Sequence, residues 1–438
     1  MKKLFVLAAL LLCGLGACTT KEYLNPSVAS ESQVAGSSDG LVALCNGLQA
    51  RYTTNAQLSV LYNTTAISGL GTREFLILNV GNDQENNISL GGASVNNGNT
   101  LVRNVWTQNQ LIRANADLIL RNLNNAPDAG TRAGILAYAS IFRALALGNL
   151  AQYFEQSPIV TGDNAPFVPR AQLLKEAVAQ LETAATQLAA TPVSADFNSK
   201  IVPGLDLSNT VQALIARYSL EAGDNDKAIA AAGRVDLTKR SVFNFDDNTR
   251  NPLFEAVFSN RNVFEPTDVN LGLTGILAPD PNDRRIPFLV RAAPTATQNR
   301  GTAFYTANNA PVPVYVPGEM LLIRAEAFAR KADLTNAVAE LNRVRTKTPA
   351  QDIYGLGAGL PAYAGPVTQS DILLDILENR FIELAFQGFR LGDSRRFGRP
   401  GPGPNVPAGA VLERNRNFYP YPRVERENNS QTPADPLF

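Results

Sequence analysis

The chain has 438 residues, of which 45% are hydrophobic and 18% are charged, a composition typical of a folded protein with a sizeable core. Its 39 basic residues balance 39 acidic residues and form no basic stripe, so we expect no nucleic-acid partner. Histidine is absent, which excludes Ser-His-Asp and Cys-His catalysis and every histidine-ligated metal centre. Chemistry that needs only two carboxylates, such as glycoside hydrolysis, remains open.

The N-terminus has the composition of an export signal. Lys2 and Lys3 precede an apolar run over residues 4–12 that is too short for a conventional transmembrane helix. The sequence Leu-Gly-Ala-Cys then ends at Cys18, and it resembles the lipobox of bacterial lipoproteins, whose cysteine is lipidated. We predict a signal peptide over residues 1–17 and a lipid anchor, such as palmitate, on Cys18. The alternative is an ordinary secretion signal with an incidental cysteine.

A lipidated polar tether is predicted over residues 18–35, and a first helix from residue 34 to about residue 61. Cys45 lies within this apolar segment, and we expect it to be a small buried residue and not a nucleophile. Residues 63–100 are rich in Asn, Gly and Ser, which predicts turns and loops.

Long helices are predicted where Ala and Leu recur at a spacing of three to four residues. Short polar turns separate these segments, so we expect the helices to pack in antiparallel pairs. The segments lie at 101–124, 132–154, 170–190 and 209–235, and the periodicity returns at 317–346 and 370–387.

The remaining sequence completes a single predicted domain over residues 36–438, with helical repeats at about 101–235 and 317–398. Residues 236–316 contain Pro, Asn, Asp and many Phe residues, which predicts a loop-rich insertion carrying short strands. Residues 399–438 are rich in proline, which predicts an extended C-terminal tail that lies over the helical body.

A search for repeats favours a tetratricopeptide-like arrangement. With the pattern set on residues 318–349, Ala325 and Ala337 occupy the positions where two antiparallel helices approach closely, and Leu321 and Leu341 occupy bulky positions. A weaker copy covers residues 209–235. We therefore predict a mainly α fold, a tetratricopeptide-like helical-repeat scaffold with the loop-rich insertion. The alternative is a set of generic helical hairpins.

Several sequence blocks resemble the SusD/RagB family of nutrient-uptake outer-membrane lipoproteins. The C-terminal blocks are PGEMLLIRAEA at residues 317–327 and ILENRFIELAFQGFR at residues 376–390. The tail sequence YPYP at residues 419–422 and the opening CTTKEYLNP at residues 18–26 are also similar to that family. Gln387 departs from the family pattern, where glutamate is common.

The resemblance implies a protein that is not an enzyme and needs no cofactor. A protein of this family would be anchored in the outer membrane, facing the cell surface. It would bind a glycan or oligosaccharide, or another nutrient, and deliver it to a SusC-like TonB-dependent transporter. The chain contains one tryptophan, Trp106, which argues against a Trp-rich binding platform.

The resemblance also places the glycan site in two segments, residues 63–106 and 236–316. A sugar site needs an aromatic face for the pyranose ring, and planar amide, carboxylate or guanidinium partners for the hydroxyls. The candidates for ligand binding are Arg73, Asn82, Asp83, Trp106 and Tyr305. The alternative for each aromatic residue is a place in the core.

Charged residues near the end of the last long helix are predicted to be structural. We expect Arg380, Glu383, Arg390 and Asp393 to form ion pairs that lock this helix to the following turn. A catalytic pair of Glu378 and Glu383 is excluded, because residues five apart on a helix point about 140° away from each other. The sequence predicts no catalytic residue and no metal ligand.

Two other functions remain open at this stage. The first is a helical-repeat adaptor lipoprotein that binds only proteins; it would face the periplasm and be protected from protease on intact cells. The second is a glycan hydrolase that depends on acidic residues in segments 63–106 or 236–316.

Overall fold

The computed structural model describes residues 31–403, 406 and 410–438. The predicted signal peptide, Cys18 and most of the tether lie outside the described residues. Within them the chain is mainly helical, with a few strands of two or three residues, so the predicted mainly α fold with a loop-rich insertion is confirmed.

The first helical segment is broken where one continuous helix was predicted. α2 (Glu31–Ala35) and α3 (Ser38–Thr53) are followed by a turn before α4 (Val60–Gly71). In this turn Asn55 and Ala56 have positive φ angles of 71° and 44°, which a right-handed helix cannot accommodate. The Ser59 side chain then accepts a hydrogen bond from the Tyr62 backbone N–H and starts α4.

The predicted helices of the first repeat region are present. Most of them begin at an Asn, Asp or Ser residue whose side chain accepts a backbone N–H, as expected of helix caps. They are α6 (Thr100–Arg121), α7 (Ala129–Tyr153), α8 (Arg170–Ala190), α9 (Ala195–Lys200), α10 (Leu207–Ala222) and α11 (Asn225–Ala232).

The central helix of this region is α7. It is long and apolar enough to cross a membrane, but 94% of its most apolar window is buried inside the fold. Its glycines allow close approach: a Cβ at Gly148 would lie 2.2 Å from the Tyr218 ring, and one at Gly134 would lie 2.6 Å from the Phe197 ring. α7 is therefore a core helix of the repeat array.

The second repeat region contains the predicted helical pair. α13 (Pro317–Arg330) and α14 (Leu334–Arg345) pack through Leu321, Ala325, Ala337 and Leu341, all buried in one hydrophobic cluster. α15 (Gln369–Glu383), α16 (Arg390–Arg396) and α17 (Arg423–Asn428) follow.

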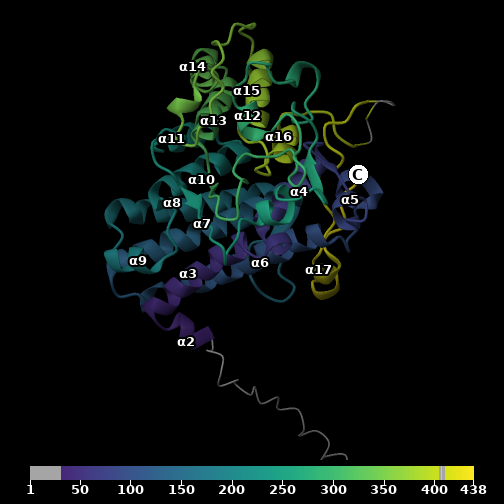
Figure 1. Cartoon of the computed structure of the whole chain (residues 1–438). Helices are drawn as coiled ribbons and strands as arrows, with labels where there is room; N and C mark the ends of the chain where they lie inside the picture. The colour runs from purple at the N-terminus through teal and green to yellow at the C-terminus, as the bar shows by residue number, and fades with distance from the viewer. Residues whose placement is uncertain (1–30, 404–405, 407–409) are drawn as a thin grey trace, which may run out of the picture.

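Helices that follow one another in the repeats also lie next to one another in space. Contacts run from α6 through α7, α8, α10 and α11 to α13, α14 and α15, so that the two repeat regions form one continuous array (Figure 1). The described helices outside this array include α5 (Asp83–Leu90) and α12 (Ile286–Leu289).

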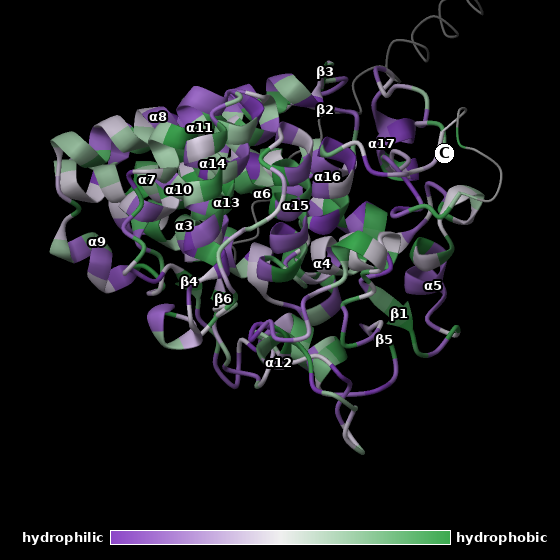
Figure 2. Cartoon of the chain, turned by 90° about the horizontal axis from the view of Figure 1, so that it is seen from above, coloured by the Kyte–Doolittle hydropathy of each residue, from purple (hydrophilic) through white to green (hydrophobic). Residues whose placement is uncertain are grey.

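Six short strands form three antiparallel pairs among the described residues. β1 (Phe75–Ile77) pairs with β5 (Phe264–Pro266), β2 (Gln156–Pro158) with β3 (Phe167–Pro169), and β4 (Val242–Phe243) with β6 (Val312–Pro313). Single turns complete the elements: η2 (Ala56–Leu58), η3 (Gly92–Ser94), η4 (Leu123–Asn125), η5 (Phe254–Phe258, a π-helical turn), η6 (Gly275–Leu277) and η7 (Pro349–Gln351). β1 and β5 lie at the opposite end of the molecule from α9 (Figure 2).

The C-terminal tail crosses the surface of the helical body. Its backbone N–H groups at Asn415 and Tyr419 donate to the carbonyls of Gly71 and Tyr153, respectively. The tail ends near α5 and carries α17, a short helix that its proline content did not predict (Figure 1).

Candidate functional site

The β1–β5 pair brings together the two segments that were predicted to form the ligand site. Phe75 lies opposite Pro266, and Ile77 lies opposite Phe264. The pairing extends past the strands, because the Leu78 N–H donates to the Val263 carbonyl at 3.0 Å. The two segments are nearly 200 residues apart in sequence, yet they present their polar side chains on one surface, which we call the β1–β5 surface.

An amide cluster lies at one end of the β1–β5 surface. The Asn79 side chain donates to the Asn262 side-chain oxygen at 3.0 Å, and the Asn82 side chain donates to the Asn262 backbone carbonyl at 2.8 Å. Asp83 is exposed at the start of α5, and its carboxylate has no partner among the described residues. This end of the surface therefore offers amide and carboxylate groups to solvent.

Arg73 lies at the other end, in a backbone conformation that is unfavourable for a side chain. It follows α4 with a positive φ of 60°, and its carbonyl accepts the Thr267 hydroxyl at 2.7 Å. Gly272 packs on the same carbonyl, where a Cβ would lie 2.1 Å away. The Arg73 side chain is exposed, and its guanidinium has no hydrogen bond or ion pair to any described residue.

Two buried charged residues, Glu74 and Arg390, connect this surface to the C-terminal region. Glu74 accepts the Phe386 backbone N–H at 3.1 Å, and burial raises the pKa of Glu74 while Arg390 opposes that rise. Arg390 donates to the Leu271 carbonyl at 2.5 Å, and burial lowers its pKa. The Arg73 end of the β1–β5 pair is thereby tied to the C-terminal region. A small cavity of about 30 Å³ beside Arg73 is also lined by Arg390.

The structure does not support the predicted ligand-binding role of Trp106. Its side chain is 2% exposed and lies in an aromatic cluster, 4.7 Å from the Phe154 ring centroid and 5.7 Å from that of Tyr421. Its indole N–H donates to Glu425 of α17 at 3.1 Å. Trp106 faces the core because it lies on the apolar side of α6, and the tail then covers it.

Tyr305 is also buried, so the structure does not support its predicted ligand-binding role either. It is 2% exposed, its ring centroid lies 4.8 Å from that of Phe258, and its hydroxyl donates to the Phe386 carbonyl at 2.7 Å. Among the aromatic side chains of the described residues, only Phe438 is exposed. The β1–β5 surface therefore has no exposed aromatic ring in the described part of the chain.

The predicted set of four ion-paired residues is only partly formed. Arg380 binds Asp393 through two hydrogen bonds of 2.9 and 3.0 Å, as predicted. Glu383 pairs instead with Arg285 and Lys347, both at 3.0 Å. Arg390 has no carboxylate within 4.0 Å among the described residues and lies over the Phe381 ring.

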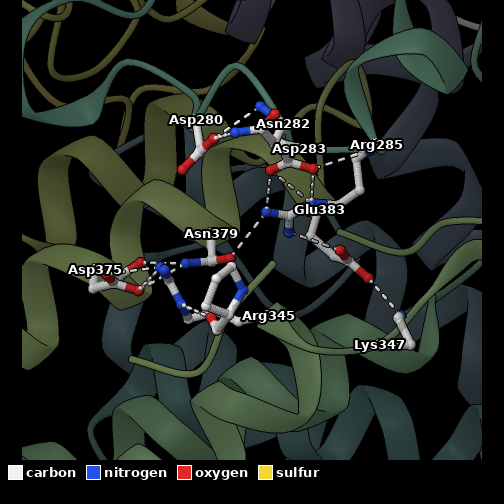
Figure 3. A network of polar contacts seen from close by, with 10 residues as sticks. Asp280, Asn282, Asp283, Arg285, Arg345, Lys347, Asp375, Asn379 and Glu383 are labelled. Carbon is white, nitrogen blue, oxygen red and sulfur yellow. Dashed lines mark hydrogen bonds and ion pairs between the residues drawn. The ribbon is translucent and has the colours of Figure 1, made fainter. Parts of the chain in front are cut away.

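Glu383 belongs to a buried polar network that joins the insertion to α14 and α15 (Figure 3). Arg285 is 1% exposed and donates to Asp283, to Glu383 and to the Asn379 side-chain oxygen at 2.9 Å. Burial opposes the charge of Arg285, but the two carboxylates outweigh this effect and raise its pKa. Lys347 completes the network by pairing with both Asp352 and Glu383.

This network is structural, because its charged groups use one another as partners. Glu383 also fits closely against Gly318, where a Cβ would lie 1.8 Å from a Glu383 carboxylate oxygen. No cluster of three or more Asp, Glu, Cys or His side chains suited to a metal ion occurs within residues 31–403, 406 and 410–438. Cys45 is fully buried, as predicted, and burial raises the pKa of its thiol.

Sequence reasoning missed three residues of the β1–β5 surface: Asn79, Asn262 and Thr267. Asn262 precedes the apolar residues Val263 and Phe264, and this contrast is the only local signal for a strand start. Its pairing with Asn79 depends on a contact across 183 residues, which no short pattern encodes.

Comparisons with known proteins agree with this fold. A model of the SusD family matches residues 258–435. No match to the chain is found among curated proteins. Similar solved structures include a SusD superfamily protein from Bacteroides fragilis (18% identity, TM-score 0.68, covering 90% of this chain and 98% of that one). Another is a SusD-like carbohydrate binding protein from Bacteroides vulgatus (17% identity, TM-score 0.68, covering 90% and 97%).

A third similar structure is a SusD superfamily protein from Bacteroides thetaiotaomicron, at 14% identity and a TM-score of 0.68, covering 91% of this chain and all of that one. At these identities each likeness shows a shared fold. The family match covers the C-terminal blocks, and the fold likeness extends over both repeat regions. Residues 258–435 therefore match the SusD family model, and the chain as a whole shares the fold of SusD superfamily proteins.

Proposed function

We propose that this protein is an outer-membrane lipoprotein that binds a glycan or oligosaccharide and delivers it to a SusC-like TonB-dependent transporter. The observation that carries the proposal is the exposed Arg73 guanidinium, which has no protein partner in the described chain, on the surface where the two predicted segments meet. The solved structure from Bacteroides vulgatus, described as carbohydrate binding, supports a sugar as the ligand.

The β1–β5 surface offers hydrogen-bonding groups suited to sugar hydroxyls. A guanidinium can donate to two neighbouring hydroxyl oxygens, and carboxamides and carboxylates can accept from hydroxyl groups. Arg73 and Asp83 supply such groups, and the exposed side chains of Val80 and Ile276, 69% and 68% exposed, supply apolar contact. Binding here would rest on hydrogen bonds and small apolar contacts.

The anchor and location are part of the same proposal. The lipobox-like sequence ending at Cys18 and the polar residues that follow it favour a lipid anchor at the outer membrane, facing the cell surface. In that setting the protein would hold its ligand site against a transporter.

Binding without chemistry is the mode of action that we propose. The chain has no histidine, and Asp283, Asp393 and Glu383, buried in the described part of the chain, are held in ion pairs. A general acid or base needs a carboxyl group that is free to exchange a proton with substrate. In this proposal the ligand is released unchanged.

The test begins with a panel of glycans and peptides, followed by titration calorimetry with the best ligand. Arg73→Ala should lower affinity about tenfold or more, as expected for a lost charge-assisted hydrogen bond. Arg234→Ala is the matched control, because Arg234 is exposed in the helical repeats and also lacks a described partner. Its affinity should equal that of the wild type.

Isolation from native membranes tests the delivery step, because a large TonB-dependent transporter should co-purify with the protein. Absence of affinity across the whole panel, together with absence of a transporter, would contradict the proposal.

A further inference from the structure

A second cavity lies away from the β1–β5 surface, where α7, α8 and α10 meet α16 and the C-terminal tail. Its volume is about 180 Å³. It is lined by three arginines, Arg170, Arg395 and Arg396, and by two carboxylates, Glu221 and Asp393. The proposed glycan-binding function makes no use of these residues.

Two of the three arginines have only uncharged partners. Arg395 donates to the backbone carbonyls of Asn417 and Gln152, at 2.6 and 2.9 Å, and stacks over the Phe418 ring. Arg170 donates through Nε to the Ala151 carbonyl at 3.0 Å, which leaves both of its Nη atoms without a described partner. Neither arginine has a carboxylate within 4.0 Å in the described part of the chain.

The carboxylates at the cavity form no ion pair with Arg170 or Arg395. Asp393 is already bound by Arg380 and Arg396, and Arg396 is also paired with Glu326. Glu221 makes no hydrogen bond or ion pair with any described residue.

The electrostatics agree with an excess of positive charge. Burial, followed by the charge of Arg170, lowers the pKa of Arg395 to about 9, although the charge of Glu221 opposes this fall. Burial also raises the pKa of Glu221, while the charges of Arg396 and Arg170 oppose that rise. An anion placed between the guanidinium groups would relieve their mutual repulsion.

We propose that this cavity binds a small oxyanion, of the carboxylate or phosphate class, between Arg170 and Arg395. Guanidinium groups bind such anions through short, charge-assisted hydrogen bonds. The free Nη atoms of Arg170 and the remaining N–H groups of Arg395 are the donors, and the Phe418 ring forms an apolar wall beside them. The anion is a free ion or the acidic group of a larger ligand such as a sugar acid.

The experiment is titration calorimetry of the purified protein with sodium phosphate, sodium acetate and sodium gluconate, at constant ionic strength set with chloride. Arg170→Gln and Arg395→Gln should each weaken binding about tenfold or more. Glu221→Gln should strengthen binding, because it removes the negative charge that repels the anion. Arg121→Gln, at an exposed arginine at the end of α6, should leave the affinity unchanged.

Arg395→Gln loses two hydrogen bonds to the backbone, so this variant can fail to fold. Arg170→Gln and Glu221→Gln lose fewer contacts. Their expected effects on anion affinity are opposite, a decrease for Arg170→Gln and an increase for Glu221→Gln, so these two variants test the proposal if Arg395→Gln does not fold. The proposal is overturned if no anion binds, or if neither of these two variants changes the affinity. Phosphate binding without acetate or gluconate binding would assign the site to phosphate. Glycan affinity should be the same in all of these variants, which separates this site from the β1–β5 surface.

Discussion

The network around Arg285 and the surface around Arg73 are built from the same chemical groups, yet they differ in how those groups are used. Arg285 is buried and donates to Asp283, Glu383 and Asn379, so its guanidinium is held on several sides. Arg73 is exposed and has no described partner for its guanidinium. The number of partners, and not the residue type, separates a structural arginine from a candidate binding residue.

Because of this difference in burial and partners, we expect substitutions in the two regions to change different quantities. A buried charge that loses its partners destabilises a fold strongly, whereas an exposed charge contributes little to stability. Changes at the Arg285 network should therefore alter the free energy of unfolding, and changes at the Arg73 surface should alter ligand affinity.

The largest expected effect comes from Arg285→Met. This variant leaves Asp283 and Glu383 buried with fewer partners, so the free energy of unfolding should fall by about 3–5 kcal/mol. Urea unfolding followed by circular dichroism measures this change. Arg234→Met, at an exposed position, should change stability by less than about 0.5 kcal/mol. If the two variants lowered the free energy of unfolding equally, the Arg285 network would have no special role in stability.

Trp106→Ala extends the comparison to an aromatic residue. Because the side chain is buried against Phe154 and Tyr421, we expect a loss of about 3–5 kcal/mol in the free energy of unfolding. Ligand affinity, measured where the variant remains folded, should stay at the wild-type value. A variant of wild-type stability that has lost affinity would return Trp106 to the binding site.

Arg73→Gly should separate stability from binding in one substitution. Glycine tolerates the positive φ of 60° at this position, so the free energy of unfolding should rise by about 0.5–1 kcal/mol. The variant lacks the guanidinium, so ligand affinity should fall by about as much as in Arg73→Ala. A more stable variant that keeps wild-type affinity would show that the strained backbone at Arg73 does not serve to hold a ligand-binding side chain.

The smallest expected effect is a pH dependence at the edge of the Arg285 network. Burial, with a contribution from Asp375, raises the pKa of Glu378 to about 7. The protonated form is therefore favoured in the folded state, and the stability that it contributes is lost as the pH rises through about 7.

Glu378→Gln should remove this loss. We expect its melting temperature to exceed that of the wild type by about 1–2 °C at pH 8, with little difference at pH 4. A difference of the same size at both pH values would show that Glu378 does not titrate in this range.

The helical part of the fold was predictable because its signals are local. Alanine and leucine periodicity located α6, α7, α8 and the α13–α14 pair, and the tetratricopeptide register placed Ala325 and Ala337 in contact. The Arg380–Asp393 ion pair was predictable for the same reason, since its members are close in sequence.

The site was less predictable because its contacts are long-range. Glu383 pairs with Arg285, 98 residues away, through an insertion that has no periodic pattern. β1 and β5 have three residues each, too few to show the alternation by which a strand is recognised. Trp106 and Tyr305 were chosen for their chemistry, but their burial depends on the tail and on Phe386, which only the folded chain brings near them.

The most direct test of the β1–β5 surface is a crystal structure of the protein with the best oligosaccharide from the panel. We expect ligand hydroxyls within hydrogen-bond distance of the Arg73 guanidinium and of Asn82 or Asp83. An oligosaccharide bound elsewhere, with Arg73 still free of any partner, would contradict this expectation.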